Sequence, residues 1–95
     1  MQYFGEWNTI TGKRNGCGVE ICSEYFIIGR FTDGISTGRA FLLQKSGDAY
    51  YGTMKDGKMH GEKGIRVYGN GDVYKGDFVQ DKREGNGTYI NTQSI

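Results

Sequence analysis

The segment from Gly71 to Tyr89 reads GDVYKGDFVQDKREGNGTY, and its spacing of tyrosine, glycine and phenylalanine recurs through the chain. Within it, Tyr74, Gly76 and Phe78 lie on one face of a strand, because successive strand side chains point to opposite faces. The glycine leaves a notch between two large side chains, over which an aromatic ring can lie flat. This segment therefore predicts one β-hairpin whose face is built from rings packed on glycines.

The same spacing returns four times in the 95 residues, at glycines 5, 29, 52 and 76. It predicts a single domain over residues 1–95, made of units at approximately 3–24, 25–47, 48–71 and 72–90. One hairpin cannot bury its face alone, whereas stacked hairpins can. The positions that define the repeat are Tyr3, Gly5, Trp7, Gly16, Gly18, Gly29, Phe31, Gly38, Tyr50, Gly52, Gly57, Gly61, Gly64, Tyr74, Gly76, Phe78, Gly85 and Gly87.

Turn residues separate the predicted strands. Asp33-Gly34 and Asp56-Gly57 are strong hairpin signals, since glycine adopts positive φ without cost. In the third unit Gly61 and Gly64 stand three apart instead of two, which predicts a β-bulge around residues 62–63. The fold class that follows is all-β: an elongated, twisted, single antiparallel sheet, built as a meander of about eight short strands.

Composition narrows the function classes. The chain has 17 Gly, no Pro and 14% aromatic residues, which disfavours a helix bundle. Its 12 basic residues are matched by 11 acidic ones, so we expect no nucleic-acid partner. There is no apolar run long enough to span a membrane and no leader-like start. Cys17 and Cys22 are too far apart along a strand for a disulfide, so we expect reduced thiols in a cytoplasmic protein.

The repeat resembles the MORN repeat (membrane occupation and recognition nexus), whose pattern is Tyr-x-Gly, an aromatic residue two positions later, a turn glycine and then Gly-x-Gly. The segment from Tyr74 to Tyr89 matches it best. The chain departs from the pattern at Ile27, Ala40, Met54 and Asp81, which stand for Tyr, Gly, an aromatic residue and the turn Gly. The resemblance implies a non-catalytic module that binds proteins and, in some members, lipid. Such repeats occur in ciliary axonemes, cytoskeletal rings and membrane junctions.

The sequence gives only weak evidence for a nucleotide-binding, catalytic or metal-binding site. Residues 52–58 spell most of a phosphate-binding loop, but Met59 stands where Ser or Thr must coordinate Mg²⁺. His60 lacks a nucleophile and an orienting group nearby in the sequence, so a structural role is favoured. Asp33, Asp56 and Asp81 recur at one turn position and are interpreted as turn formers. We expect no enzyme activity, cofactor or metal.

Two surfaces are candidates for binding. One is the second face of the sheet, since a single layer cannot hide all its apolar side chains. Its candidate protein-binding residues are Phe4, Phe26, Ile28, Phe41, Leu43 and Tyr51. The other is the edge formed by the hairpin turns, whose candidate lipid-binding residues are Lys13, Arg14, Lys55, Lys58, Lys82 and Arg83. Acidic residues are interspersed there, so solvated charge is the simpler interpretation.

The function predicted first is a structural scaffold or adaptor in a larger assembly, most plausibly ciliary, axonemal or otherwise cytoskeletal. Its partners would be other proteins, or a second copy joined through an end strand, because an uncovered edge strand can pair with another chain. One alternative is a membrane-surface module that binds anionic phospholipid through the basic turn edge. Another is an accessory subunit of a different large complex, such as an organellar one.

Overall fold

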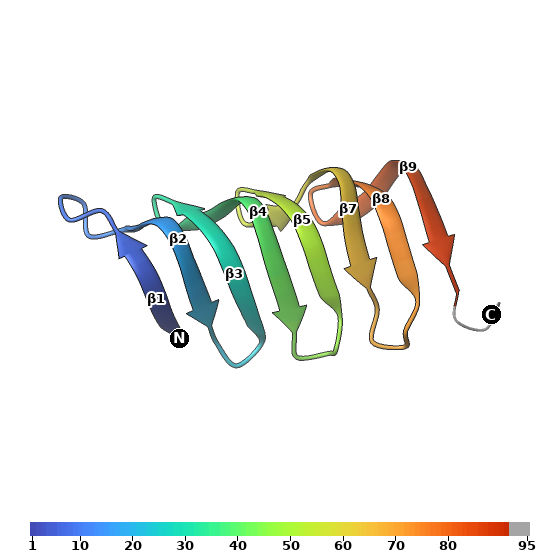
Figure 1. Ribbon diagram of the computed structural model, residues 1–95, viewed down its shortest axis with the longest axis horizontal. Helices are drawn as coiled ribbons and strands as arrows, with labels where there is room; N and C mark the ends of the chain where they lie inside the picture. The colour runs from blue at the N-terminus through green and yellow to red at the C-terminus, as the bar shows by residue number, and fades with distance from the viewer. Residues whose placement is uncertain (92–95) are drawn as a thin grey trace.

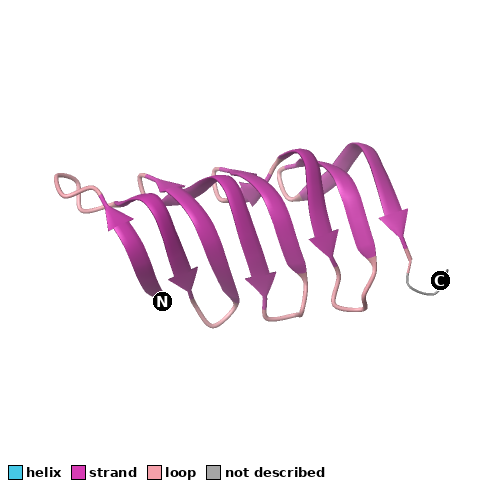
Figure 2. Ribbon diagram, viewed as in Figure 1, coloured by secondary structure: helices cyan, strands magenta, loops and turns pink. Residues whose placement is uncertain are grey.

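A computed structural model describes residues 1–91, and they form one open antiparallel sheet (Figure 1). The strands are β1 (Gln2–Trp7), β2 (Arg14–Ile21), β3 (Tyr25–Thr32), β4 (Ile35–Gln44), β5 (Ala49–Lys55), β6 (Lys58–Met59), β7 (Gly61–Val67), β8 (Val73–Val79) and β9 (Lys82–Ile90). They follow the order β1-β2-β3-β4-β5-β7-β8-β9, with the two-residue β6 paired to β5. No helix occurs among the described residues (Figure 2), so the predicted all-β meander is confirmed.

Tight turns join the strands along the upper edge in Figure 1. Asp33-Gly34 and Asp56-Gly57 have positive φ at both residues, the geometry that matches the twist of a hairpin. Gln80 and Asp81 adopt the same conformation, with φ of 47° and 71°, although neither is glycine. Each of these turns also donates a backbone hydrogen bond to the preceding unit, as the 2.8 Å bond from Asp81 N to Met59 O illustrates. The turns therefore tie neighbouring units together.

The predicted bulge around residues 62–63 is confirmed. Gly61 pairs with Phe78 and Gly64 with Gly76, so one extra residue lies on β7, and Lys63 takes a φ of 58°. A bulge re-aims the side chains that follow it, because each one-residue slip moves a strand's side chains to the opposite face. Here it returns Gly64 to the face on which the core lies.

The spacing of residues predicts a bulge in the third unit alone, but the structure has register shifts in the other units as well. Register shifts also occur where β1 pairs with β2, β3 with β4, and β8 with β9. A glycine at positive φ accompanies each of them, at Gly16, Gly38 and Gly85, with φ of 102°, 75° and 69°. Every unit therefore bends its returning strand at a glycine, which curls the upper edge of the sheet.

Tyrosine rings cover the glycines as predicted, on what we call the inner face of the sheet. The phenol of Tyr74 donates to Asp77 O at 3.1 Å, and its ring lies over Gly76 and Gly87. Tyr3 and Tyr50 repeat this arrangement, each donating to the carbonyl three residues ahead. The hydrogen bond keeps the ring flat, and the missing Cβ atoms leave room for it.

Aromatic contacts between units build the thin core. Tyr3 meets Phe31 of the next unit edge to face at 5.2 Å, and Tyr50 meets Phe78 in the same way at 5.1 Å. Phe31, Tyr50 and Phe78 are each only 1% exposed. Each unit therefore depends on its neighbour, as expected for an array whose units cannot bury their faces alone.

Candidate interaction surfaces

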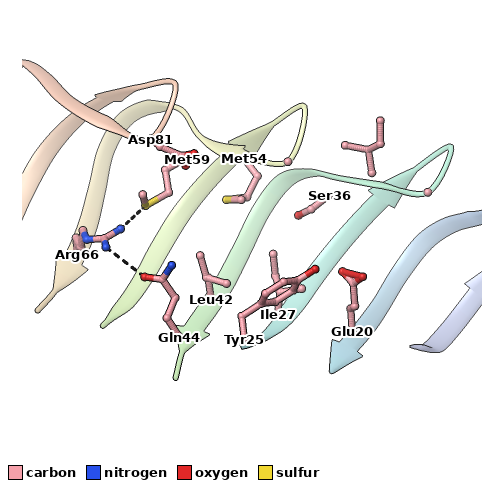
Figure 3. Close-up of a pocket in the computed structure, with 13 residues that line it drawn as sticks. Glu20, Tyr25, Ile27, Ser36, Leu42, Gln44, Met54, Met59, Arg66 and Asp81 are labelled. Carbon is pink, nitrogen blue, oxygen red and sulfur yellow. Dashed lines mark hydrogen bonds between the residues drawn. The ribbon is translucent and has the colours of Figure 1, made fainter. Parts of the chain in front are cut away.

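A groove opens on the inner face where the middle two units meet (Figure 3). At this junction the positions taken by Tyr and Phe at the other two are occupied by Ile27 and Met54, which carry no ring. The groove has a volume of about 570 Å³. Its lining residues are Glu20, Tyr25, Ile27, Gly34, Ile35, Ser36, Leu42, Gln44, Met54, Gly57, Met59, Arg66 and Asp81. The departures from the repeat therefore gather at one place and create a cavity there.

Ala40 explains why the second unit remains packed without its tyrosine. Ala40 pairs with Gly29 and is 3% exposed. A Cβ added at Gly29 would stand 2.7 Å from the Ala40 Cβ, so the alanine methyl fills space above this glycine. In the other units a tyrosine ring lies over the glycine pair, as Tyr74 does over Gly87. The exchanges at positions 27 and 40 are therefore complementary.

One polar group in the groove lacks a partner. Ser36 is 8% exposed, and its hydroxyl makes no hydrogen bond within the described part of the chain. A buried hydroxyl left unsatisfied costs about 1–3 kcal/mol. The Ser36 oxygen is itself covered, so a ligand would reach it only after the side chains around it shift. Ser36 lies among apolar side chains that include Met54 and Met59, and flexible methionines adapt to different ligand shapes (Figure 3). The groove thus combines an apolar floor with an unused hydrogen-bonding group.

Charged residues stand at the two ends of the groove. Glu20 forms a 2.6 Å ion pair with Arg14, whose guanidinium also lies over the ring of Tyr3. At the other end Arg66 pairs with Asp48 at 3.0 Å and reaches Gln44 Oε1 at 3.2 Å. Both pairs are partly buried, so they hold the walls of the groove in place.

Tyr25 lies beside the acidic end. Burial, followed by the nearby Glu20 carboxylate, raises the pKa of Tyr25 to about 12 from its ordinary value of 10.0. A hydrogen bond between the phenol and Glu20 contributes to the same shift, so the Tyr25 proton is already engaged at the rim of the groove.

The opposite face, which we call the outer face, carries two apolar rows that cross all eight strands of the sheet path. Strand register aligns the first outer row as Phe4, Val19, Ile28, Phe41, Tyr51, Ile65, Lys75 and Thr88. It aligns the second outer row as Gln2, Ile21, Phe26, Leu43, Ala49, Val67, Val73 and Ile90. The six candidate protein-binding residues all lie in these rows; Phe26 is half-buried and the other five are 40–58% exposed.

Seven apolar members of these rows were not among the sequence candidates: Val19, Ile21, Ala49, Ile65, Val67, Val73 and Ile90. A periodic signal locates them. The outer-face positions directly precede and follow the repeat tyrosine position. They also come one and three residues after the closing position of each unit, which is glycine in three units and Ala40 in the second. Counting from those two anchors would have assigned the whole face.

The basic turn edge offers fewer unengaged cations for lipid binding than its composition suggests. The sequence predicts Arg14 as a lipid-binding cation, but its guanidinium is engaged by Glu20 and Tyr3. Arg83 lies over the rings of Tyr68, Tyr74 and Tyr89, at 5.1–5.9 Å. The exposed cations that remain are Lys13, Lys55, Lys58 and Lys82.

Residues considered for catalysis or metal binding have structural partners. The ring of His60 accepts a hydrogen bond from Gln80 N at 3.4 Å, and its carbonyl accepts one from Thr53 Oγ1 at 2.6 Å. Asp81 accepts a hydrogen bond from Met59 N at 2.8 Å. Among residues 1–91 no three His, Cys, Asp or Glu side chains gather as a metal site would require. The same residues include no helix with the length and apolarity needed to cross a membrane.

Comparison with protein families gives one finding. A family model described as the MORN repeat matches residues 12–25, 50–73 and 74–92, which together are more than half of the chain. The stretch between the first two matches contains most of the second unit, where Ile27 and Ala40 depart from the repeat. A comparison with curated proteins found no match.

Proposed function

This chain belongs to the MORN repeat family, whose repeats are often protein- or membrane-interaction modules and generally non-catalytic, and we propose that it is a scaffold that holds other proteins in a larger assembly. The observation that carries the proposal is the inner groove, with its unpartnered Ser36 hydroxyl. A partner segment with an apolar side chain would contact Met54 and Met59, and a shift of the side chains that cover Ser36 would let a neighbouring polar group bond to its hydroxyl.

The rigidity of the array suits this role. Edge-to-face ring pairs join the units at the first and third junctions, and at the middle junction, where the groove lies, Gly57 N donates a backbone hydrogen bond to Ser36 O at 3.1 Å, so both walls of the groove belong to one continuous hydrogen-bonded sheet. Binding then needs little ordering of the scaffold, which lowers its entropic cost. No turnover is involved in this mechanism; the module acts through its shape and its hydrogen-bonding groups.

The choice of assembly rests on the family alone. Repeats of this kind recur in ciliary axonemes and other cytoskeletal structures, and this favours a ciliary or cytoskeletal complex and a cytoplasmic location. An accessory subunit of another large complex, such as an organellar one, is the alternative. The identity of the captured partner separates the two.

The test compares two arginine substitutions at isoleucines. Ile35 is 48% exposed and lines the groove, whereas Ile10 is 93% exposed and lies in a loop away from it. Ile35→Arg should block the groove without disturbing the core, and Ile10→Arg is the matched control. Affinity purification with quantitative mass spectrometry should recover a set of partners with the wild type and Ile10→Arg, and lose it with Ile35→Arg. An equal set with all three proteins would contradict the proposal.

Binding of anionic phospholipid through the basic turn edge is the second candidate. Lys13, Lys55, Lys58 and Lys82 are exposed, although Asp56 and other acids lie among them. Co-sedimentation with vesicles that contain phosphatidylserine tests this function, since such binding should disappear between about 0.05 M and about 0.5 M salt. Binding that persists at high salt, or that survives replacement of the four lysines by glutamine, would contradict it.

A further inference from the structure

We propose that copies of this chain join head to tail: the edge strand β9 of one copy pairs antiparallel with the edge strand β1 of the next, in the register that joins the units inside the chain. β1 and β9 are the two ends of the strand order, so each has one side that no strand of residues 1–91 covers (Figure 1). Such a strand is a template for pairing with another chain. The inference is independent of the groove, which opens where the middle two units meet.

Three junctions inside the chain define that register. At each one the last strand of a unit pairs with the first strand of the next unit, as β2 with β3, β4 with β5 and β7 with β8. In the first junction Gly18 pairs with Gly29, and the glycine two residues earlier, Gly16, pairs with Phe31. β9 has the spacing of a last strand and β1 that of a first strand. The same register at the joint gives the pairs Gly85 with Trp7, Gly87 with Gly5, and Tyr89 with Tyr3.

Trp7 is more exposed than the residues at its position in other units. It is 51% exposed, whereas Phe31 and Phe78, which hold the same position, are each 1% exposed. Each phenylalanine meets the tyrosine of the preceding unit edge to face, Phe31 with Tyr3 and Phe78 with Tyr50. No unit precedes Trp7 in the described residues, and its ring lacks that cover.

The tyrosine that could cover Trp7 lies at the other end of the array. Tyr74 meets Phe78 of its own unit at 5.2 Å, and in residues 1–91 no ring of a following unit lies against it. At the proposed joint, Trp7 of one copy meets Tyr74 of the other as Phe31 meets Tyr3. The joint therefore repeats a contact that the chain already makes twice.

The turns of the upper edge favour the same orientation. Each turn donates a backbone hydrogen bond to a carbonyl of the preceding unit, and the acceptors are Arg14, Ser36 and Met59. On β9 the equivalent residue is Arg83, and no turn lies beyond it in the described part of the chain. The loop between β1 and β2 extends past β1, on the side away from β2 (Figure 1). A head-to-tail joint brings this loop over β9, whereas pairing of β1 with β1, or of β9 with β9, inverts one copy and separates the two.

Charge does not oppose the joint. The segments that would pair are residues 85–90 and 2–7, and their one charged side chain is Glu6. In the repeated register Glu6 stands opposite Asn86, a neutral residue. Like charges directly opposite each other, which destabilise a strand pair, are therefore avoided.

The test blocks each edge separately. Trp7→Glu blocks the β1 edge, because it places a carboxylate against Tyr74 of the neighbouring copy, and it should weaken pairing at least about 100-fold. Trp7→Phe is its matched control, since it restores the residue type of the second and fourth units.

Tyr89→Pro blocks the β9 edge. Tyr68 N donates to Asp72 O, so Asp72 and, by alternation, Tyr74 direct their backbone groups towards β7. Tyr89 pairs with Tyr74 and therefore directs its own groups away from β8. Proline there removes an outward N–H and no bond of the β8–β9 ladder, which an edge strand tolerates. Tyr89→Phe, which keeps the N–H and the ring, is the matched control.

Sedimentation and light scattering measure mass from about 5 to about 500 μM, with a reductant present because Cys17 is exposed. The wild type and both phenylalanine controls should grow beyond the mass of two chains as concentration rises, since every added copy leaves one edge free. Trp7→Glu alone and Tyr89→Pro alone should stay at the 10.6 kDa of one chain. Their equimolar mixture should reach twice that mass and stop, because each variant keeps the edge that the other has lost. Far-UV circular dichroism verifies that each variant is folded.

Four outcomes would overturn the proposal. A wild type that stays at 10.6 kDa has no such joint, and one that stops at two chains pairs symmetrically. A folded blocked variant that grows like the wild type associates through another surface. A mixture of folded variants that stays at the mass of one chain excludes pairing of β9 with β1. The groove variant Ile35→Arg should assemble as the wild type does, so failure of the scaffold proposal is observed separately.

Discussion

Replacing Gly87 by alanine tests the ring-over-glycine packing most directly. A Cβ at this position would stand 2.6 Å from Tyr74 Cε1 and closer still to the phenol oxygen, where ordinary contacts are 3.4 Å or more. Tyr74 is 7% exposed and meets Phe78 edge to face at 5.2 Å, so its ring has little room to retreat. The φ of Gly87 is not in the positive range, and the effect therefore comes from the ring contact and not from backbone strain.

The expected cost follows from three contributions. Overpacking costs about 1–3 kcal/mol, and loss of the hydrogen bond from Tyr74 to Asp77 O costs about 1 kcal/mol more. The lower entropy of alanine in the unfolded chain offsets about 0.4–1 kcal/mol. Gly87→Ala should therefore lower the free energy of unfolding by about 2 kcal/mol. Tyr74→Ile, which removes the ring, should lower it by about 3 kcal/mol.

The double variant gives the decisive result. Tyr74→Ile with Gly87→Ala reproduces the natural pair Ile27 and Ala40 of the second unit, in which the methyl replaces part of the ring. It should therefore lose about 3 kcal/mol instead of the 5 kcal/mol that simple addition gives, a coupling of about 2 kcal/mol.

Urea unfolding followed by far-UV circular dichroism measures all four proteins. With a slope of about 1 kcal/mol per molar urea, Gly87→Ala should shift the midpoint by about 2 M. Losses that add to within about 0.5 kcal/mol would show that the two positions do not compensate each other. The account of the second unit would then be wrong.

Three further predictions concern single residues. Asp81→Ala should lower the free energy of unfolding, measured in urea, by about 1–2 kcal/mol. It removes the carboxylate that accepts from Met59 N, and it does so at a residue whose φ is 71°. Asp81→Asn keeps an acceptor there and should stay within about 0.5 kcal/mol of the wild type. Gly57→Ala should cost about 1 kcal/mol from its φ of 78° alone, since the nearest atom would be 3.8 Å away; an unchanged midpoint would contradict this. The pKa of Tyr25 is raised to about 12 in the folded chain, so the unfolded chain ionises first, and stability that is complete below pH 10 should fall as pH rises towards 12. Tyr25→Phe should have a flatter stability profile between these pH values, and an identical profile would refute the assignment.

Much of the fold follows from local patterns. The Tyr-x-Gly-x-Phe spacing predicts a strand with a notch, and Asp-Gly predicts the turn, so each hairpin can be derived from about twenty consecutive residues. The bulge in the third unit was predictable because its glycines are three apart. The bulges at Gly16, Gly38 and Gly85 were not predicted, since only the paired strand shows which residue lacks a partner.

The candidate surfaces were only partly predictable. Six outer-face residues were found because they fall outside the main spacing, but the continuity of the rows depends on register across all eight strands. The basic edge was read from composition, and composition could not show that Glu20 and Tyr3 engage Arg14. The groove was not predicted, because Ile27 and Met54 lie far apart in the sequence and look like two unrelated departures from the repeat pattern.

The sequence by itself therefore determined the architecture: a four-unit array of hairpins with rings over glycines, because period and turn chemistry are local properties. The tertiary structure decided where binding surfaces lie. Cavities and apolar faces arise from side chains of different units, and their juxtaposition depends on strand register and on bulges that move residues from one face to the other. In this chain the departures at Ile27, Ala40 and Met54 acquire a meaning only when the neighbouring units are in place, where they open a groove beside Ser36.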